Sequence, residues 1–473
     1  NTHHNHKSLK LLLVPRFREQ GLDIHFAQVV NDKRDSGYTT GSAGLVEQLT
    51  PAFEELVESL LLLPNQQQAT AVPGASSSTT TASSSSPPGL PPPLTCIISD
   101  LYLYFTQDIA NKYGVKRMAF WTASATMLAT AMSVVAHGHR APPPGHEGSL
   151  ITWIPGAPPL RRSELNEFLL NPDHTVDLMY EVYYTSYKRL PETTCIAINT
   201  FEELEPEALK ALREDNAPVK VFSVGPLLPD AYLNASTGVT NGAGGMAVGL
   251  GSYPVASLWK EDNECLQWLN RQEPGSVLYV SFGSIAIMSG EQFEELAMGL
   301  EESGSAVLWV LRPDLMAMAG GQAVLPEGFL ERTKDKMFMV EWAPQLQVLA
   351  HPAVGGFLSH CGWNSTIESL SAGVPTLGWP YFSDQRLNNR LLVDVWGLGL
   401  EVQRCGGKNT LLVPRGEIAC KVVALMKRGH SEGGLSKVKE AAIHWRDAAY
   451  RASQQPHGSS NVAIGLLVKS FLD

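Results

Sequence analysis

Short apolar runs alternate with amphipathic stretches along most of this chain, and that alternation restricts its fold more than any other feature. It predicts parallel sheets with helices on both faces, the α/β class. At roughly 150 residues per domain, 473 residues suffice for two or three domains, and we expect two doubly wound ones. The predicted strands are Ile24–Val30, Thr95–Ser99, Cys195–Asn199, Ser276–Ser281, Ala306–Leu311, Phe338–Val340, Val354–Ser359 and Pro375–Trp379. The clearest helical patterns are Phe105–Tyr113, Glu291–Glu301, Ser365–Ala372 and Arg386–Val395.

Two compositional breaks divide the chain. Asn65–Pro93 is rich in Ser, Thr and Pro, so it cannot bury a core and is predicted to be a disordered surface insertion. Val219–Val224 has the pattern of a further strand, and Tyr232–Val255 after it is rich in Gly, Ala and Ser and is predicted to be an interdomain linker. We therefore expect an N-terminal domain over residues 1–231 and a C-terminal domain over 256–454. Residues 455–473 are expected to form a helix that packs back on the N-terminal domain.

Charge and cysteine content exclude several classes of protein. The net charge is −11 and no block of Lys or Arg occurs, which argues against binding nucleic acid through its phosphates. The six cysteines are scattered without a CxxC pair, a pattern of reduced thiols in a cytosolic protein and not of structural zinc. No apolar run approaches the ~20 residues that span a bilayer, and no signal-peptide pattern opens the chain.

Several catalytic and cofactor motifs are missing. The sequence has no GxGxxG after a strand, no GxxxxGK[ST], no HExxH and no DxD pair. One GxSxG match occurs, at Gly429–Gly433. A nucleophile elbow needs a strand before the serine, but Glu417–Arg428 has a helical pattern. We interpret this match as a polar loop between helices.

The densest group of unusual residues lies between Trp342 and Gln385. There a predicted buried strand, Val354–Ser359, leads through a glycine-containing turn into a helix expected to begin near Thr366. The backbone N–H groups at the start of a helix, together with its dipole, form an anion site. Gly362 allows a close backbone approach. The turn also contributes three side-chain donors, so it can bind a diphosphate without Lys or Arg: His360, Asn364 and Ser365.

The same residues also have purely structural interpretations. The Ser365–Glu368 segment fits a capping box. His360 fits a core histidine with satisfied hydrogen bonds, Trp342 and Trp363 fit core aromatics, and Asp384 fits the start of the next helix. A ligand site is favoured because all of them fall within 44 residues, at predicted loops on the carboxyl side of strands. Open α/β sheets bind their ligands at that edge.

This block resembles the signature box of the plant family-1 UDP-dependent glycosyltransferases. The similarity lies in its 44-residue length and its pattern: WAPQ, HxxxGGFxxHCGWNSxxES, GVP and a final DQ. It extends over most of the chain in the family's order: CIISD around Asp100, FWTASA at Phe120–Ala125, NTFEELE at Asn199–Glu205, VGPL at Val224–Leu227, WLNRQEPGSVLYVSFGS at Trp268–Ser284 and WVLRP at Trp309–Pro313.

The resemblance implies two Rossmann-like domains facing across a cleft, the GT-B arrangement. The N-terminal domain would bind the acceptor and the C-terminal domain a UDP-sugar co-substrate. Gln385, the last residue of the box, favours glucose. The implied donor contacts are Trp342 stacking on uracil, Ala343 at its edge through the backbone, Gln345 and Glu368 on the ribose, Ser284, His360, Asn364 and Ser365 on the diphosphate, and Trp363, Asp384, Gln385 and Thr122 on the sugar.

The family inverts the anomeric centre with a histidine as general base, oriented by a buried aspartate, and needs no metal ion. Asp100 matches that aspartate, with capping of the following helix as the alternative. The family's histidine follows its first strand, whereas Asn1-Thr2 resembles the end of its second, so we expect the segment with the base to be absent. No histidine is assigned, because four candidates do not fit the pattern: His3, His4, His6 and His25.

Two hypotheses therefore remain. In the first, the chain transfers glucose from UDP-glucose to a hydroxyl of a small lipophilic acceptor, a plant secondary metabolite or hormone, and forms a β-glycoside. In the second, it is a truncated protein that binds a UDP-sugar without transferring it. A lectin-like module is a weaker alternative, and it predicts that UDP would not stabilise the chain against thermal unfolding.

Overall fold

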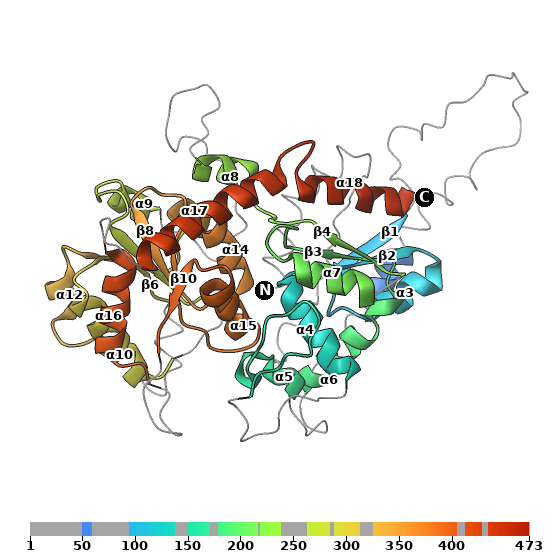
Figure 1. Cartoon of the computed structure of the whole chain (residues 1–473), viewed down its shortest axis with the longest axis horizontal. Helices are drawn as coiled ribbons and strands as arrows, with labels where there is room; N and C mark the ends of the chain where they lie inside the picture. Colours follow the sequence, from blue (N-terminus) through green and yellow to red (C-terminus); the bar gives the residue numbers. More distant parts are fainter. Residues whose placement is uncertain are drawn as a thin grey trace, which may run out of the picture.

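The computed structural model describes ten segments of the chain and contains two parallel sheets (Figure 1). One sheet has four strands in the order β1-β2-β3-β4, and the other has six in the order β10-β9-β8-β5-β6-β7. The prediction of two parallel α/β domains is confirmed. The described residues are 50–58, 94–137, 149–170, 178–215, 218–237, 263–283, 288–312, 325–403, 412–427 and 434–472.

The N-terminal sheet places the predicted catalytic aspartate at its carboxyl edge. Asp100 ends β1 and pairs in register with Phe120, so Thr122 follows β2 at the same edge. The strands are β1 (Cys96–Asp100), β2 (Lys116–Trp121), β3 (Cys195–Ile198) and β4 (Lys220–Ser223). The helices are one over residues 50–58, α3 (Thr106–Tyr113), α4 (Ala125–Ala136), α5 (Glu167–Leu170), α6 (Leu178–Lys188), α7 (Pro206–Asp215) and α8 (Asp230–Thr237).

The C-terminal sheet aligns three strand ends. Ser281 of β5 lies beside Ser359 of β8, which lies beside Gly378 of β9. The strands are β5 (Val277–Ser281), β6 (Ala306–Val310), β7 (Met337–Val340), β8 (Val354–Ser359), β9 (Thr376–Gly378) and β10 (Gly399–Glu401). The helices are α9 (Glu264–Leu269), α10 (Gly290–Glu302), α12 (Phe329–Thr333), α13 (Gln345–Leu349), α14 (Trp363–Ala372), α15 (Gln385–Arg390), a π-helical turn (Leu391–Val395), α16 (Arg415–Met426), α17 (Gly434–Ser453) and α18 (Ser459–Leu472).

The predicted strands recur within one or two residues wherever the structure describes them, because helices on both faces bury them as continuous apolar runs. The sequence analysis did not predict β2 or β10 as strands. Three predicted features lie outside the described residues: the strand Ile24–Val30, the insertion Asn65–Pro93 and the GxSxG loop. The helical pattern expected before that loop is present as α16.

The last helix of the chain packs on the N-terminal sheet. Figure 1 shows α17 beside the C-terminal sheet and α18 continuing over the N-terminal one. Burying this apolar face joins the chain's end to its first described domain. The contact consists of Ile464, Leu467, Val468 and Phe471 against Met118, Phe120, Cys195, Ala197, Phe222 and Val224.

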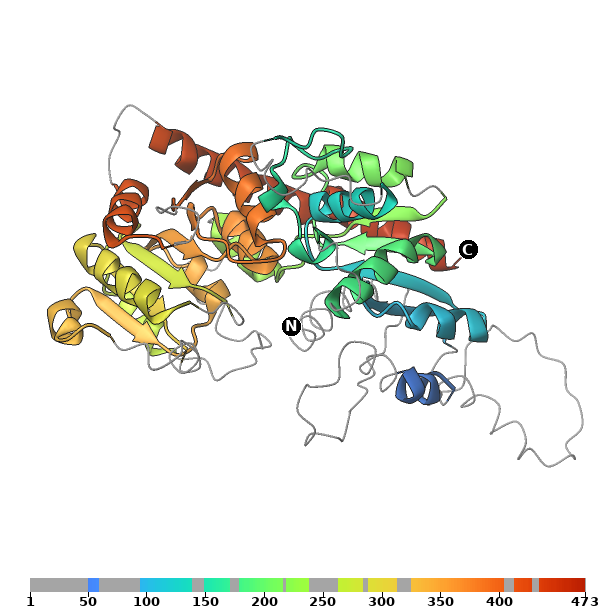
Figure 2. The same ribbon diagram turned by 90° about the horizontal axis from the view of Figure 1, so that it is seen from below.

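The two domains share a hydrophobic core. Trp363 and Trp396 belong to one buried cluster with Trp121 and Leu204 of the N-terminal domain. The indoles of Trp363 and Trp396 also donate hydrogen bonds across the interface. Trp363 Nε1 lies 2.8 Å from the Asn199 carbonyl, and Trp396 Nε1 lies 3.2 Å from that of Leu204. Figures 1 and 2 both show α14 and α15 on the side of the C-terminal domain that faces its neighbour.

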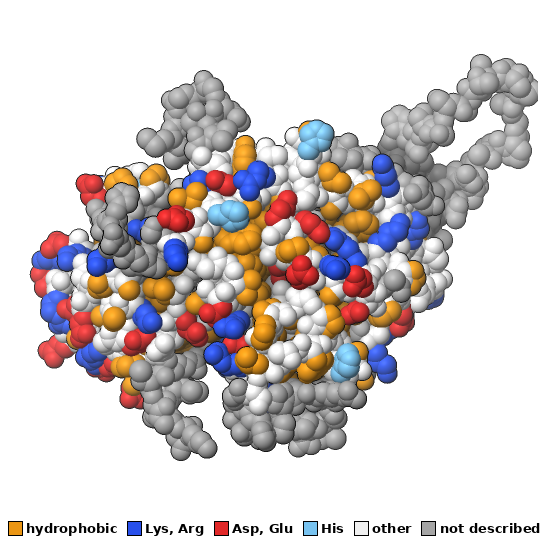
Figure 3. Space-filling view, in the orientation of Figure 1, with side chains coloured by type: hydrophobic (Ala, Val, Ile, Leu, Met, Phe, Trp, Pro, Cys, Tyr) orange, Lys and Arg blue, Asp and Glu red, His pale blue; other side chains and the backbone are white. Residues whose placement is uncertain are grey.

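The surface carries both signs of charge. On the face shown in Figure 3, Lys and Arg side chains are interspersed with Asp and Glu. In the described part of the chain, no helix is both long and apolar enough to cross a membrane.

Candidate active site

The turn after β8 leads into a helix whose first N–H groups have no side-chain cap. Gly362 is the N-cap residue of α14 and makes no side-chain cap bond, so the helix begins at Trp363. The predicted capping box is therefore wrong, because Ser365 lies within the first turn of the helix and Glu368 in the next. Asn364 and Ser365 accompany those N–H groups, which is the arrangement that binds an anion.

His360 lies between two glycines that leave room for its ring. A Cβ atom added to either Gly283 or Gly362 would lie 2.6 Å from the imidazole, and Gly283 has a positive φ of 69°. Burial lowers the pKa of His360 to about 4, and the Arg312 charge also lowers it. The imidazole is therefore uncharged near pH 7 and can serve as a neutral hydrogen-bond donor.

The two residues predicted to bind ribose contact each other. Gln345 begins α13, and its Nε2 donates to Glu368 Oε2 at 2.7 Å and to Ser365 Oγ at 3.0 Å. Its Oε1 accepts from the Tyr279 hydroxyl at 3.2 Å. Burial raises the pKa of Glu368 to about 7 from an ordinary value of 4.5. This cluster joins the segment after β7 to the helix after β8.

The residues predicted to bind uracil lie directly before α13. Ala343 is buried, whereas Trp342 is partly exposed. Both precede Gln345 along the chain, and their contacts with uracil stay a prediction.

Replacing Glu368 by glutamine is expected to change how stability depends on pH. The folded protein holds the Glu368 carboxyl at a pKa above its ordinary value, so protonation favours the folded state. That stabilisation is complete below about pH 4.5 and is lost as pH rises through 7. Glu368→Gln should therefore melt near the wild-type temperature at pH 5 and above it at pH 8. If the difference in melting temperature between Glu368→Gln and the wild type is the same at pH 5 and pH 8, the raised pKa of Glu368 is contradicted.

The residues predicted to bind the sugar surround the start of α15. Asp384 is its N-cap residue but makes no side-chain cap bond. Its carboxylate accepts instead from Asn388 Nδ2 at 2.8 Å, and burial raises its pKa to about 6. Gln385 Oε1 accepts from the N–H groups of Tyr381 and Phe382 at 2.9 and 3.2 Å. The side chains of Asp384 and Gln385 therefore hold their own turn in shape.

Two further predicted sugar ligands lie at the domain interface. The indole of Trp363 is buried and donates to the Asn199 carbonyl, so it joins the two domains. Burial raises the pKa of Asp384, whereas a hydrogen bond from the Trp363 main chain lowers it. Thr122 follows β2 and is partly exposed. The contacts of Trp363 and Thr122 with the sugar stay predictions.

Asp100 lies at the carboxyl end of β1, with its side chain bound to the next turn. Its Oδ1 accepts from the Tyr102 N–H at 2.9 Å. The helix α3 starts at Thr106 with Phe105 as its N-cap residue, so the alternative role of Asp100 as a helix cap is wrong. Burial raises its pKa to about 6, opposed by the Tyr102 N–H and by the charge of Arg117.

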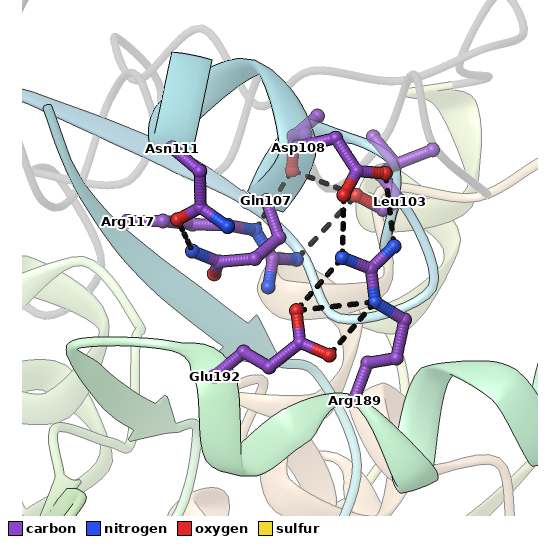
Figure 4. Close-up of polar contacts among 8 residues, drawn as sticks. Leu103, Gln107, Asp108, Asn111, Arg117, Arg189 and Glu192 are labelled. Atoms are coloured by element: carbon purple, nitrogen blue, oxygen red, sulfur yellow. Dashed lines mark hydrogen bonds and ion pairs between the residues drawn. The ribbon is translucent and has the colours of Figure 1, made fainter. Parts of the chain in front are cut away.

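Arg117, a buried residue of β2, holds this turn through hydrogen bonds. The sequence analysis did not predict this role. Its Nε donates to Thr106 Oγ1 at 2.7 Å and to Ser99 Oγ at 3.0 Å, and its Nη2 donates to the Asp100 carbonyl at 3.3 Å. Burial lowers the pKa of its guanidinium to about 10. Figure 4 shows it beside a second network, in which Arg189 pairs with Asp108 and Glu192.

Comparison with known proteins decides the family. The family model "UDP-glucoronosyl and UDP-glucosyl transferase" matches residues 255–405. UDP-glycosyltransferase 85A3 of Arabidopsis thaliana is 37% identical over 392 residues, 80% of this chain and 75% of that protein. The chain belongs to the plant family-1 UDP-dependent glycosyltransferases.

Two relatives of this glycosyltransferase are named after the acceptor that they glucosylate. The 7-deoxyloganetin glucosyltransferase of Gardenia jasminoides is 36% identical, and the (R)-mandelonitrile beta-glucosyltransferase of Prunus dulcis is 34% identical, each with 80% of this chain and 75% of the relative covered.

Solved structures confirm the GT-B arrangement for this glycosyltransferase. Phytolacca americana UGT2 complexed with UDP-2fluoro-glucose and pterostilbene is 30% identical with a TM-score of 0.66, over 80% of this chain and 76% of that one. Os79 from O. sativa in complex with UDP has a TM-score of 0.73 over 98% and 97% of the two chains. At 22% identity it supports the fold alone.

Some predictions for this glycosyltransferase fall outside the described residues. Ser284 is one of them, and so are His3, His4, His6 and His25. The general base is therefore not placed. Within the described segments, no group of three or more His, Cys, Asp or Glu residues could hold a metal ion.

Proposed function

We propose that this glycosyltransferase moves glucose from UDP-glucose to a hydroxyl of a small lipophilic plant metabolite, with inversion at the anomeric carbon. The observation that carries the proposal is the cluster of Gln345, Ser365 and Glu368 next to the uncapped start of α14 and His360. It links a ribose-binding pair to a diphosphate-binding turn. The glucosyl donor is supported by the glucosyltransferase names of the relatives and by the final Gln385 of the box.

In the proposed reaction, neutral groups stabilise the leaving diphosphate. The N–H groups at the start of α14, the Asn364 and Ser365 side chains and the uncharged His360 donate hydrogen bonds to it. These donors supply the stabilisation without a metal ion. Because they are already in place before the reaction, little reorganisation accompanies the departure of UDP.

The acceptor would bind beside Asp100, against an aromatic wall. The rings of Tyr102 and Tyr183 lie 4.5 Å apart, and the hydroxyls of Tyr102 and Tyr187 lie 2.8 Å apart. Trp121 packs edge-on against Tyr102 with centroids 5.6 Å apart. Aromatic rings favour contact with other flat or apolar groups. Trp121 and Tyr187 are buried, so the acceptor would contact the partly exposed Tyr102 and Tyr183, and these two rings support the proposal of an aromatic or terpenoid acceptor.

The proposed mechanism needs a histidine base, which the described residues do not place, oriented by Asp100. This base takes the proton of the acceptor hydroxyl. The hydroxyl oxygen then forms a bond to C1 of the glucose as the bond from C1 to the UDP oxygen breaks, and UDP leaves. Attack opposite the leaving group converts the α-linked donor into a β-glucoside. The carboxylate of Asp100 would stabilise the imidazolium that forms.

The test is a turnover assay with defined acceptors. The chain is incubated with UDP-glucose and a panel of phenols, terpenoid alcohols and cyanohydrins, and we expect UDP release together with β-glucosides identified by their anomeric proton coupling. UDP at a hundred times its Kd should add about 2.7 kcal/mol to the free energy of unfolding. Stabilisation by UDP without any product would instead indicate a UDP-sugar-binding protein, and an α-glucoside would contradict inversion.

A further inference from the structure

The turn that carries Asp384 and Gln385 has an unusual backbone. It connects β9 to α15, and Ser383 within it has a φ of 57°. Residues with a side chain rarely adopt this left-handed conformation unless neighbouring contacts hold them in it. The contacts of Ser383 therefore decide how the next two residues are presented.

The main-chain N–H of Ser383 donates a hydrogen bond to a residue of the other domain. Glu167, at the start of α5, accepts from the Ser383 N–H with both carboxylate oxygens, at 2.9 and 3.1 Å. Glu167 Oε2 also lies 3.9 Å from Arg386 Nη1. Tyr183 of α6 also reaches this turn, where it forms a hydrogen bond with the Ser383 side chain. Segments 216 residues apart in sequence thus meet at this one turn.

The C-terminal domain holds the rest of the turn by itself. Gln385 Oε1 accepts from the N–H groups of Tyr381 and Phe382, and Arg386 Nη2 donates to the Tyr381 carbonyl at 2.8 Å. None of these three bonds involves the Ser383 N–H. Its hydrogen bond to Glu167 therefore exists only while the two domains are together.

We propose that Glu167 is a positioning residue that holds the Ser383 turn, so that Asp384 and Gln385 are set for the sugar of the donor only when the acceptor domain is docked. This role rests on the proposed function, because it assumes that Asp384 and Gln385 bind the sugar. It makes the affinity for the glucosyl group, but not that for UDP, depend on a residue of the acceptor domain. The predicted contacts of UDP lie outside the Ser383 turn, at Gln345 of α13, His360 after β8 and Glu368 of α14.

The test compares the binding of UDP and of UDP-glucose to the full chain by calorimetry. Glu167→Ala should raise the Kd of UDP-glucose about tenfold, since it removes a charged acceptor, while the Kd of UDP stays within about twofold. Glu167→Gln keeps one oxygen acceptor and should lose about threefold for UDP-glucose. A rise in melting temperature with UDP in each variant shows that it is folded.

Glu202→Ala is the matched control. The Glu202 side chain is 41% exposed against 36% for Glu167, and its ion pair with Arg213 at 2.8 Å stays within the N-terminal domain. It should leave both Kd values unchanged. If Glu167→Ala raises both Kd values equally, or changes neither, the positioning role is overturned while the donor site stands. If the wild type binds neither UDP nor UDP-glucose, the proposed function fails and this role fails with it.

Discussion

Replacing Asp100 by asparagine should lower kcat for glucosyl transfer by about a hundredfold to ten-thousandfold, with the Kd of UDP unchanged. An amide cannot stabilise a positively charged imidazole as a carboxylate does. It can still accept the Tyr102 N–H through its oxygen, so the turn should keep its shape. Asp100 lies on the N-terminal sheet, away from the predicted contacts of UDP, which is why donor affinity is expected to persist.

The pH dependence of the wild type adds a second readout of Asp100. Because burial raises its pKa to about 6, the carboxylate is ionised above that pH and becomes protonated below it. The rate kcat/KM should therefore fall as pH drops through 6. Asp100→Asn should move this acidic limb to lower pH, because the amide does not titrate and no longer favours the protonated form of the base histidine.

Asp108→Asn is the control for Asp100→Asn. Asp108 is an exposed aspartate of α3 whose carboxylate pairs with Arg189 at 2.6 Å (Figure 4). It should keep kcat within about twofold, in line with the small effect of exposed ion pairs. Equal kcat values for the wild type and Asp100→Asn would show that Asp100 supports its turn without taking part in the reaction.

The fold followed from sequence because parallel strands covered on both faces are continuous apolar runs. One of the two missed strands shows the limit of this argument. β2 begins with Lys116 and Arg117, whose charges conceal its pattern, yet Arg117 is buried under Asp100. A buried arginine is tolerated there because carbonyls and hydroxyls satisfy its guanidinium. No local pattern shows that such partners will be present.

The sequence analysis grouped the predicted site residues whose contacts are local to the block, and it missed contacts that cross the domain interface. Gln345, Ser365 and Glu368 meet because the segments after β7 and β8 lie at one edge of one sheet. The Trp363 side chain and Glu167 could not be assigned in the same way, because their partners belong to the other domain. Domain packing depends on contacts far apart in sequence, and one chain's periodicity does not record them.

His360→Ala should raise the Kd of UDP by about 10- to 100-fold, because it removes a donor to a doubly charged ligand. The structure leaves little freedom for the ring, which lies where a Cβ on Gly283 or Gly362 would collide with it. The strength of the contact should also hold between pH 6 and 8. The pKa of His360 is about 4, so its imidazole does not change charge in that range.

The strand β8 supplies the control for His360→Ala, because a histidine lies near each of its ends. His351, before the strand, is partly buried, and its Nδ1 accepts from the Ala353 N–H at 3.1 Å. Like His360→Ala, His351→Ala therefore removes an imidazole ring and a hydrogen bond. It does so at the amino end of β8, the edge of the sheet opposite the turn that contains His360. It should lower the melting temperature and leave the Kd of UDP within about twofold. Equal losses of UDP affinity in both variants would mean that His360 acts through the stability of β8, whereas a loss confined to His360→Ala would place the diphosphate at the start of α14.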